Sequence, residues 1–231
     1  MSRAFNFQCY HLWLKPIDEG CNLLDRVATA LIRPAVNRLA RTLHATGASA
    51  NAITIVGFGV GLSAMLLIAF HAYLLGAVAI VASRILDALD GAVARLTAPT
   101  DAGGFLDITL DFLFYASIPL AFAIADPLQN ALPAAVLLAA FIGTGSSFLA
   151  FATLAAKRGL HSAAYPSKSF YFLGGLTEAT ETLVCFLAMC FWPRYFPELA
   201  YGFSVLCLLT IATRIVGGFL KLKADAQGKK P

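Results

Sequence analysis

The chain has 231 residues, of which 59% are hydrophobic and only 13% are charged, and its mean hydropathy is +0.75. Soluble domains carry about 45–50% apolar and about 25% charged residues, so this sequence has too few polar side chains to cover a water-soluble globule. The composition excludes a disordered chain, a nucleic-acid-binding arm and a soluble enzyme. It predicts an all-α integral membrane protein.

Residues 1–48 are expected to form a basic cytoplasmic segment that contains one amphipathic helix. Between residues 23 and 43, the apolar side chains fall on one arc when successive residues are turned by about 100°, and arginines lie largely opposite. This pattern predicts an interfacial helix that lies on the membrane surface, with Pro34 as a place where it could kink. A solvated basic linker is the alternative.

Six long apolar runs follow and predict six transmembrane helices. The expected spans are 52–70, 74–96, 104–125, 131–156, 171–191 and 198–221. Asn51 is expected to cap the first span. Residues 49–222 would form one six-helix transmembrane domain, and residues 223–231 a basic cytoplasmic tail.

Basic residues concentrate on one side of this topology. They lie in the N-terminal segment, the 157–168 connection and the tail, whereas the connections on the other side contain only Arg194. By the positive-inside rule, both termini are cytoplasmic. Trp192 and Tyr195 are typical of an aromatic belt at the opposite interface.

Four aspartates interrupt the second and third spans. Asp87 and Asp90 end the second span, and Asp107 and Asp111 begin the third. An acid costs about 2.5–3.5 kcal/mol near a span centre and less near its end, so four unpaired acids could cost about 10 kcal/mol. Residues three or four apart share a helix face, and a short connection makes the two helices antiparallel neighbours. The carboxylates should therefore converge near the cytoplasmic side.

Cations must offset these acids. The nearest basic residues in sequence are Arg84 and Arg95, which leave two negative charges of the four uncompensated. Carboxylate oxygens suit hard divalent cations rather than zinc. We therefore expect two divalent cations, Mg²⁺ or Mn²⁺.

The acids belong to a longer pattern, Asp87-x-x-Asp90-Gly91-x-x-Ala94-Arg95, followed after seven residues by Gly103-x-x-x-Asp107-x-x-x-Asp111. This pattern resembles the signature of the CDP-alcohol phosphatidyltransferase family. The six-helix topology, the interfacial helix and the Asn51-Ala52-Ile53-Thr54 entry to the first span are similar to the family over most of the chain. Ala50 departs from it, because members often have proline there. The stretches DAGGFLDITLDFLFYA, FIGTGSSFLAFATLAAK and KSFYFLGGLTEATET resemble a short bacterial inner-membrane branch of unassigned acceptor.

The resemblance implies a phospholipid-biosynthesis enzyme that transfers a phosphatidyl group from CDP-diacylglycerol to an alcohol and releases CMP. It implies that Asp87, Asp90 and Asp107 bind metal, and that Asp111 is both a second-metal ligand and the general base. Two cations about 3.5–4 Å apart could neutralise the donor diphosphate and hold it for in-line attack. The implied donor-binding residues are Gly91, Ala94, Arg95, Asn51, Thr54 and Thr100.

Basic residues near the cytoplasmic ends of the last three spans are the candidates for binding a phosphate on the acceptor. These are Lys157, Lys168 and Arg214. Ordinary positive-inside residues or lipid headgroup anchors are the alternative for the lysines. Arg214 lies in an apolar run and needs a partner, which is either the acceptor or one of Glu178 and Glu181. We expect sn-glycerol 3-phosphate as acceptor, as in a phosphatidylglycerophosphate synthase, with an inositol phosphate or another polar alcohol as the alternative.

A cation-coupled transporter is the alternative from a different class, because transporters also carry intramembrane acids. Here the four aspartates cluster at one end and no second half repeats them, which favours the enzyme. The expected location is the inner (cytoplasmic) membrane, with the active site on the cytoplasmic side. Gly217 and Gly218 could pack against a second copy, so a homodimer is an additional expectation.

Overall fold

The computed structural model describes residues 23–157 and 177–228, and these residues are helical throughout apart from short connections. The elements are α1 (Leu23–Ala45), α2 (Ala50–Ala69), α3 (Tyr73–Thr97), α4 (Asp101–Ala125), α5 (Pro127–Lys157), α6 (Ala179–Phe191), the 3₁₀ turn η4 (Pro193–Tyr195) and α7 (Phe196–Gly228). The all-helical prediction is confirmed.

Four segments in the described ranges are long and apolar enough to cross a membrane. They are Ala50–Ala69, Asp101–Ala125, Pro127–Lys157 and Pro193–Lys223. Helix α3 is also long, but it carries Arg84, Asp87, Asp90 and Arg95 in its sequence. Helix α6 has 13 residues. The first residues of the expected 171–191 span lie outside the described part of the chain.

Two helix starts differ from the prediction because other residues provide the caps. Ser49 caps α2, since its Oγ accepts a hydrogen bond from the Ala52 backbone N–H at 3.2 Å. The predicted cap, Asn51, lies instead inside the first turn of α2. Thr100 caps α4 by accepting a hydrogen bond from Gly103 N–H at 3.1 Å. Helix α4 therefore begins at residue 101 instead of 104.

The start of α6 is fixed by a capping box. The Glu178 backbone N–H donates to Glu181 Oε2 at 3.1 Å, and the Glu178 side chain in turn accepts from the backbone of Glu181. Such reciprocal bonds satisfy two backbone groups at a helix start. Within the described residues α6 begins at Ala179, so the expected 171–191 helix is not continuous through residues 177 and 178, and its predicted start lies outside the described residues.

Helix α1 has two apolar faces, of which the sequence pattern identified one. Val36 and Ala40 are buried against a cluster that includes Ile53 of α2 and Val93 of α3. Leu39, which belongs to the predicted apolar arc, is 47% exposed. At Val36 and Ala40, burial against the protein thus uses a neighbouring face, while Leu39 of the predicted arc is exposed. Its contact with a membrane surface stays a prediction.

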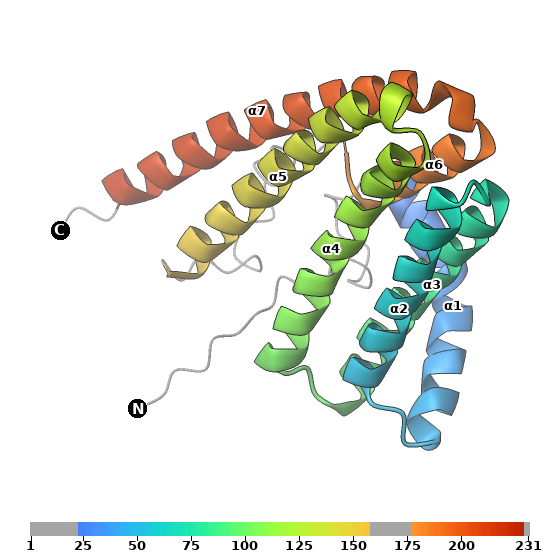
Figure 1. The fold of residues 1–231 in the computed structure, drawn as a ribbon. Helices are drawn as coiled ribbons and strands as arrows, with labels where there is room; N and C mark the ends of the chain where they lie inside the picture. Colours follow the sequence, from blue (N-terminus) through green and yellow to red (C-terminus); the bar gives the residue numbers. More distant parts are fainter. Residues whose placement is uncertain (1–22, 158–176, 229–231) are drawn as a thin grey trace.

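The helices form two groups that meet along α4 (Figure 1). Helix α2 packs on α3 and α4, and α1 packs on α3; α5 packs on α4 and runs beside α7, while α6 contacts α3 and α7. The main core lies between these groups and contains the fully buried rings Phe114, Phe122, Phe186 and Phe196. The C-terminal half of α3 and the N-terminal half of α4 therefore lie together beside α2.

Two glycines of α2 allow this close approach. A Cβ at Gly57 would lie 3.1 Å from Leu86 Cβ, and one at Gly61 would lie 2.6 Å from Phe114 Cδ2. The Ser83 hydroxyl donates a hydrogen bond to the Gly57 carbonyl at 2.8 Å and ties α3 to α2. The acidic half of α3 is fixed in register by these contacts.

Gly218 packs within the chain. A Cβ at this position would lie 3.2 Å from Phe151 Cδ2 of α5. The small residue therefore serves the contact between α5 and α7. Gly218 therefore no longer supports the expected homodimer, which stays a prediction.

Candidate metal centre and substrate pockets

Three of the four predicted aspartates converge. Asp87 and Asp90 project from α3 and Asp107 from α4, and one ligand atom from each lies within 4.8 Å of the others. Asp90 is only 5% exposed, and its Oδ2 has no hydrogen-bond partner among the described residues. A buried carboxylate oxygen without a partner is costly unless a cation or a donor group satisfies it. The three side chains therefore fit one hard divalent cation.

A pocket surrounds this cluster between α2, α3 and α4. Its lining includes Thr54 and Gly57 of α2 together with all four aspartates. The absence of a side chain at Gly57 lets α2 approach the acidic face of α3. All four acids therefore line one pocket, although only the ligand atoms of Asp87, Asp90 and Asp107 converge.

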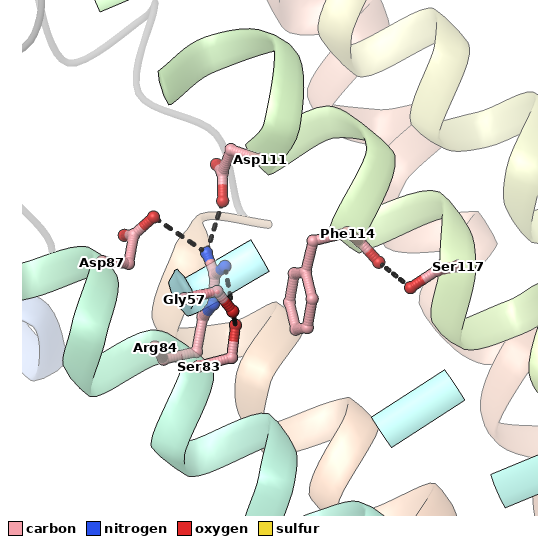
Figure 2. Close-up of polar contacts among 7 residues, drawn as sticks. All are labelled: Gly57, Ser83, Arg84, Asp87, Asp111, Phe114 and Ser117. Atoms are coloured by element: carbon pink, nitrogen blue, oxygen red, sulfur yellow. Dashed lines mark hydrogen bonds and ion pairs between the residues drawn. The ribbon is translucent and has the colours of Figure 1, made fainter. Parts of the chain in front are cut away.

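The fourth aspartate has a different partner. Asp111 Oδ1 accepts a hydrogen bond from Arg84 Nη1, and the same nitrogen lies 3.5 Å from Asp87 Oδ1 (Figure 2). The guanidinium of Arg84 lies over the Phe114 ring, with 3.9 Å between its carbon and the ring centroid. Sequence reasoning treated Arg84 only as a nearby charge and missed this pair. The spacing of Arg84 and Asp87, three residues apart on one helix, indicated only the contact between those two residues.

A second, larger pocket shares the residues of this ion pair with the first pocket. Arg84, Asp87 and Asp111 line it from α3 and α4, together with Tyr115 and the α6 residues Ala179 and Leu183. Asp111 therefore borders both pockets.

The predicted donor-binding residues lie around the cluster in two places. Gly91, Ala94 and Arg95 follow Asp90 on α3; a Cβ at Gly91 would lie 3.4 Å from Arg95 Nη1. Arg95 Nη2 is buried without a hydrogen-bond partner among the described residues. An unpaired, buried guanidinium nitrogen is suited to bind an anionic group.

The second place is the start of α4. A Cβ at Gly103 would lie 2.8 Å from Asn51 Oδ1 and 3.1 Å from Thr100 Oγ1. Asn51 and Thr100 thus meet over a glycine, although they are far apart in sequence. Thr54 lies one turn further along α2 and lines the pocket of the aspartates, while its hydroxyl donates to the Ala50 carbonyl at 3.0 Å.

The predicted acceptor-binding residues are more scattered. Lys157 is exposed at the end of α5, and Lys168 lies outside the described residues. Arg214 Nη1 donates to the Thr144 carbonyl at 3.1 Å, and its guanidinium lies 5.7 Å from the Phe148 ring centroid.

Of the two glutamates expected as partners of Arg214, Glu178 is the one whose charge acts on it. Glu178 lies close enough to attract Arg214 electrostatically. Glu181 accepts the backbone hydrogen bond of the capping box. The sequence did not suggest the Thr144 carbonyl as a partner of Arg214.

The fold and the site define an all-helical membrane protein with an acidic centre suited to a divalent cation. Residues 48–216 match the CDP-alcohol phosphatidyltransferase family, so the chain belongs to this family. The membership fits the aspartate pattern, and the chain is an enzyme of this class rather than a cation-coupled transporter.

Relatives and a solved structure agree with this membership. The chain is 50% identical over 202 residues to the inner membrane protein YnjF of Escherichia coli, covering 87% of this chain and 98% of that protein. It is 39% identical over 97 residues to an archaetidylinositol phosphate synthase of Pyrococcus horikoshii, covering 42% of this chain and 51% of that protein. The fold resembles a phosphatidylinositol phosphate synthase of Mycobacterium tuberculosis solved with CDP-DAG bound. The TM-score is 0.59 at 20% identity, over 80% of this chain and 93% of the other.

Proposed function

We propose that this protein transfers a phosphatidyl group from CDP-diacylglycerol to a polar alcohol and releases CMP. The observation that carries the proposal is the cluster of Asp87, Asp90 and Asp107, whose ligand atoms lie within 4.8 Å of one another in the family's signature segment. The buried, unpaired Oδ2 of Asp90 supports a cation at this cluster. When bound there, Mg²⁺ or Mn²⁺ would neutralise the diphosphate of the donor.

The chain's own residues would perform the remaining tasks on the donor. Arg95 would bind a donor phosphate through its unpaired Nη2, and Gly91 leaves room for that approach. Asn51, Thr54 and Thr100 would contact the CDP portion. Negative charge develops on the departing CMP, and a fixed guanidinium beside it lowers the barrier.

Asp111 would act as the general base. It borders both pockets, so a hydroxyl in the pocket beside Tyr115 would lie next to a carboxylate that can accept its proton. The acceptor oxygen then forms a bond to the phosphorus of the phosphatidyl group, and the bond from that phosphorus to the CMP oxygen breaks. The proton stays on Asp111 and CMP leaves with the electron pair.

The acceptor would be a phosphorylated polyol held by Lys157, Lys168 and Arg214. sn-Glycerol 3-phosphate is the simplest candidate. Inositol phosphate is the second candidate, because one relative is an archaetidylinositol phosphate synthase.

A second divalent cation, expected from the sequence, would need Asp111 as a ligand, and Asp111 Oδ1 already accepts a hydrogen bond from Arg84.

The same proposal includes the placement of the chain. Residues 49–222 would form a six-span domain in the inner membrane, with α3 and α6 joining the four apolar segments as spans. The excess of Lys and Arg at the N-terminal segment and the tail supports cytoplasmic termini and a cytoplasmic active site. The name of the relative YnjF supports the inner membrane.

The test uses the purified full-length protein with CDP-diacylglycerol, Mn²⁺ or Mg²⁺ and a panel of alcohols, and follows CMP release. We expect release that depends on the cation and on one phosphorylated polyol, and a loss of about 100-fold or more in Asp111→Asn. Asp101→Asn, an exposed acid in the first turn of the same helix, is the matched control. Equal rates for wild type and Asp111→Asn with every alcohol would refute the assigned base.

A further inference from the structure

Asp111 lines the same pocket as the other three acids, but its carboxylate is engaged in an ion pair. The cluster whose ligand atoms converge within 4.8 Å consists of Asp87, Asp90 and Asp107. Asp111 Oδ1 is instead bound to Arg84 Nη1, and that nitrogen also lies 3.5 Å from Asp87 Oδ1 (Figure 2). A guanidinium nitrogen therefore lies between the carboxylates of Asp111 and Asp87, in the place where a cation shared by these two carboxylates would lie.

Arg84 is held firmly in this position. Its side chain is 12% exposed, its guanidinium stacks at 3.9 Å on the Phe114 ring, and its Nη2 lies 3.4 Å from Ser83 Oγ. The Phe114 ring is 1% exposed and packs against Phe186 and Tyr115. Ser83 is itself tied to the Gly57 carbonyl. The guanidinium is therefore held against an aromatic face that suits a cation.

The balance of charge at the centre also favours a single divalent cation. Arg84 and one divalent cation together supply three positive charges to four carboxylates, so one carboxylate charge remains available to accept a proton. A second divalent cation at Asp111 would lie beside the fixed guanidinium and be repelled by it. Arginine stays protonated in proteins, so this repulsion persists at every working pH.

We propose that the Arg84 guanidinium takes the place of the second divalent cation, so that the centre binds one divalent cation and Arg84 supplies the fixed positive charge beside Asp111. Arg84 is then a positioning residue, because it orients the carboxylate that borders both pockets. This inference rests on the proposed function in taking these carboxylates as the reaction centre, and it revises the expected number of cations from two to one.

The test counts Mn²⁺ ions bound per chain to the purified full-length protein, by electron paramagnetic resonance of free Mn²⁺ and by calorimetry. We expect one ion in wild type, one in Arg84→Lys, which keeps the charge, and two in Arg84→Gln, where Asp111 becomes free to bind metal. Arg194→Gln, at the far end of the helices, is the control for loss of a positive charge and should bind one. Two ions in wild type, or one ion in a folded Arg84→Gln, would overturn the proposal.

Asp111→Asn keeps the test decisive if Arg84→Gln fails to fold. Under this proposal Asp111 binds no metal, so the variant should bind the same number of Mn²⁺ ions as wild type, with a Kd raised by no more than the roughly 10–100-fold that loss of an outer-shell partner costs. A fall in the number of bound ions relative to wild type, or a Kd raised by well over about 100-fold, would show that Asp111 is a ligand. Failure of the proposed function has a different signature, which is one bound Mn²⁺ without CMP release from any combination of donor and acceptor.

Discussion

Replacing Gly61 by alanine should disturb the site from a distance, through the packing of α2 on Phe114. The added Cβ would lie 2.6 Å from Phe114 Cδ2 and 3.0 Å from Ser83 Oγ. Non-bonded carbons prefer about 3.5–4.0 Å, so the ring must move by about 1 Å. Phe114 is buried on all sides, and such overpacking costs about 1–3 kcal/mol. For a chain of this length, that cost corresponds to a fall of about 2–12 °C in the thermal midpoint.

The same ring supports Arg84, whose guanidinium lies 3.9 Å from its centroid. A shift of about 1 Å in a positioning contact can cost about 100-fold in rate. We therefore expect a large fall in the rate of CMP release even where the fall in the thermal midpoint is small. Gly59→Ala is the matched control on the same helix, because a Cβ at Gly59 would meet no atom within 4 Å. The assay is thermal unfolding in detergent together with CMP release at 25 °C. If Gly61→Ala and Gly59→Ala gave the same midpoint and rate, the proposed coupling through Phe114 would be wrong.

Two further substitutions test the metal cluster and the donor pocket separately. Asp107→Asn should weaken Mn²⁺ binding by about 100-fold or more, since loss of even an outer-shell partner costs about 10–100-fold. In the same Mn²⁺ titration, the control Asp101→Asn should bind as tightly as wild type. Equal weakening of Mn²⁺ binding in both variants would argue against the cluster. Gly103→Ala places a Cβ 2.8 Å from Asn51 Oδ1. It should raise the KM for CDP-diacylglycerol by about tenfold while the Mn²⁺ affinity stays unchanged, and an unchanged KM would argue against donor contacts there.

Much of the helical framework and most of the site were predictable from local patterns. The apolar runs placed α2, α3 and α5 within a few residues of their observed bounds, because long hydrophobic segments have few alternatives in a membrane. The spacing of Asp87 and Asp90 indicated a shared helix face. The short connection to α4 then brought Asp107 to them, as the geometry shows.

What the sequence missed depends on contacts between distant residues. The pair of Arg84 and Asp111 spans 27 positions, and the bond from Arg214 to the Thr144 carbonyl spans 70. No periodicity within one helix encodes which neighbour a long side chain reaches after the helices pack. The cap of α2 was missed for another reason: serine and asparagine are equally good caps, so the choice between Ser49 and Asn51 depends on the packing of Asn51 near Gly103.

The central claim is that the aspartate cluster supports transfer of a phosphatidyl group to an alcohol. Its most direct test measures CMP and new phospholipid in the same reaction, with wild type and Asp90→Asn, with and without Mn²⁺. The account predicts equal molar amounts of CMP and phospholipid, formed only when wild type, cation and acceptor are all present. Equal product formation by Asp90→Asn, or CMP released by wild type without any new phospholipid, would contradict it.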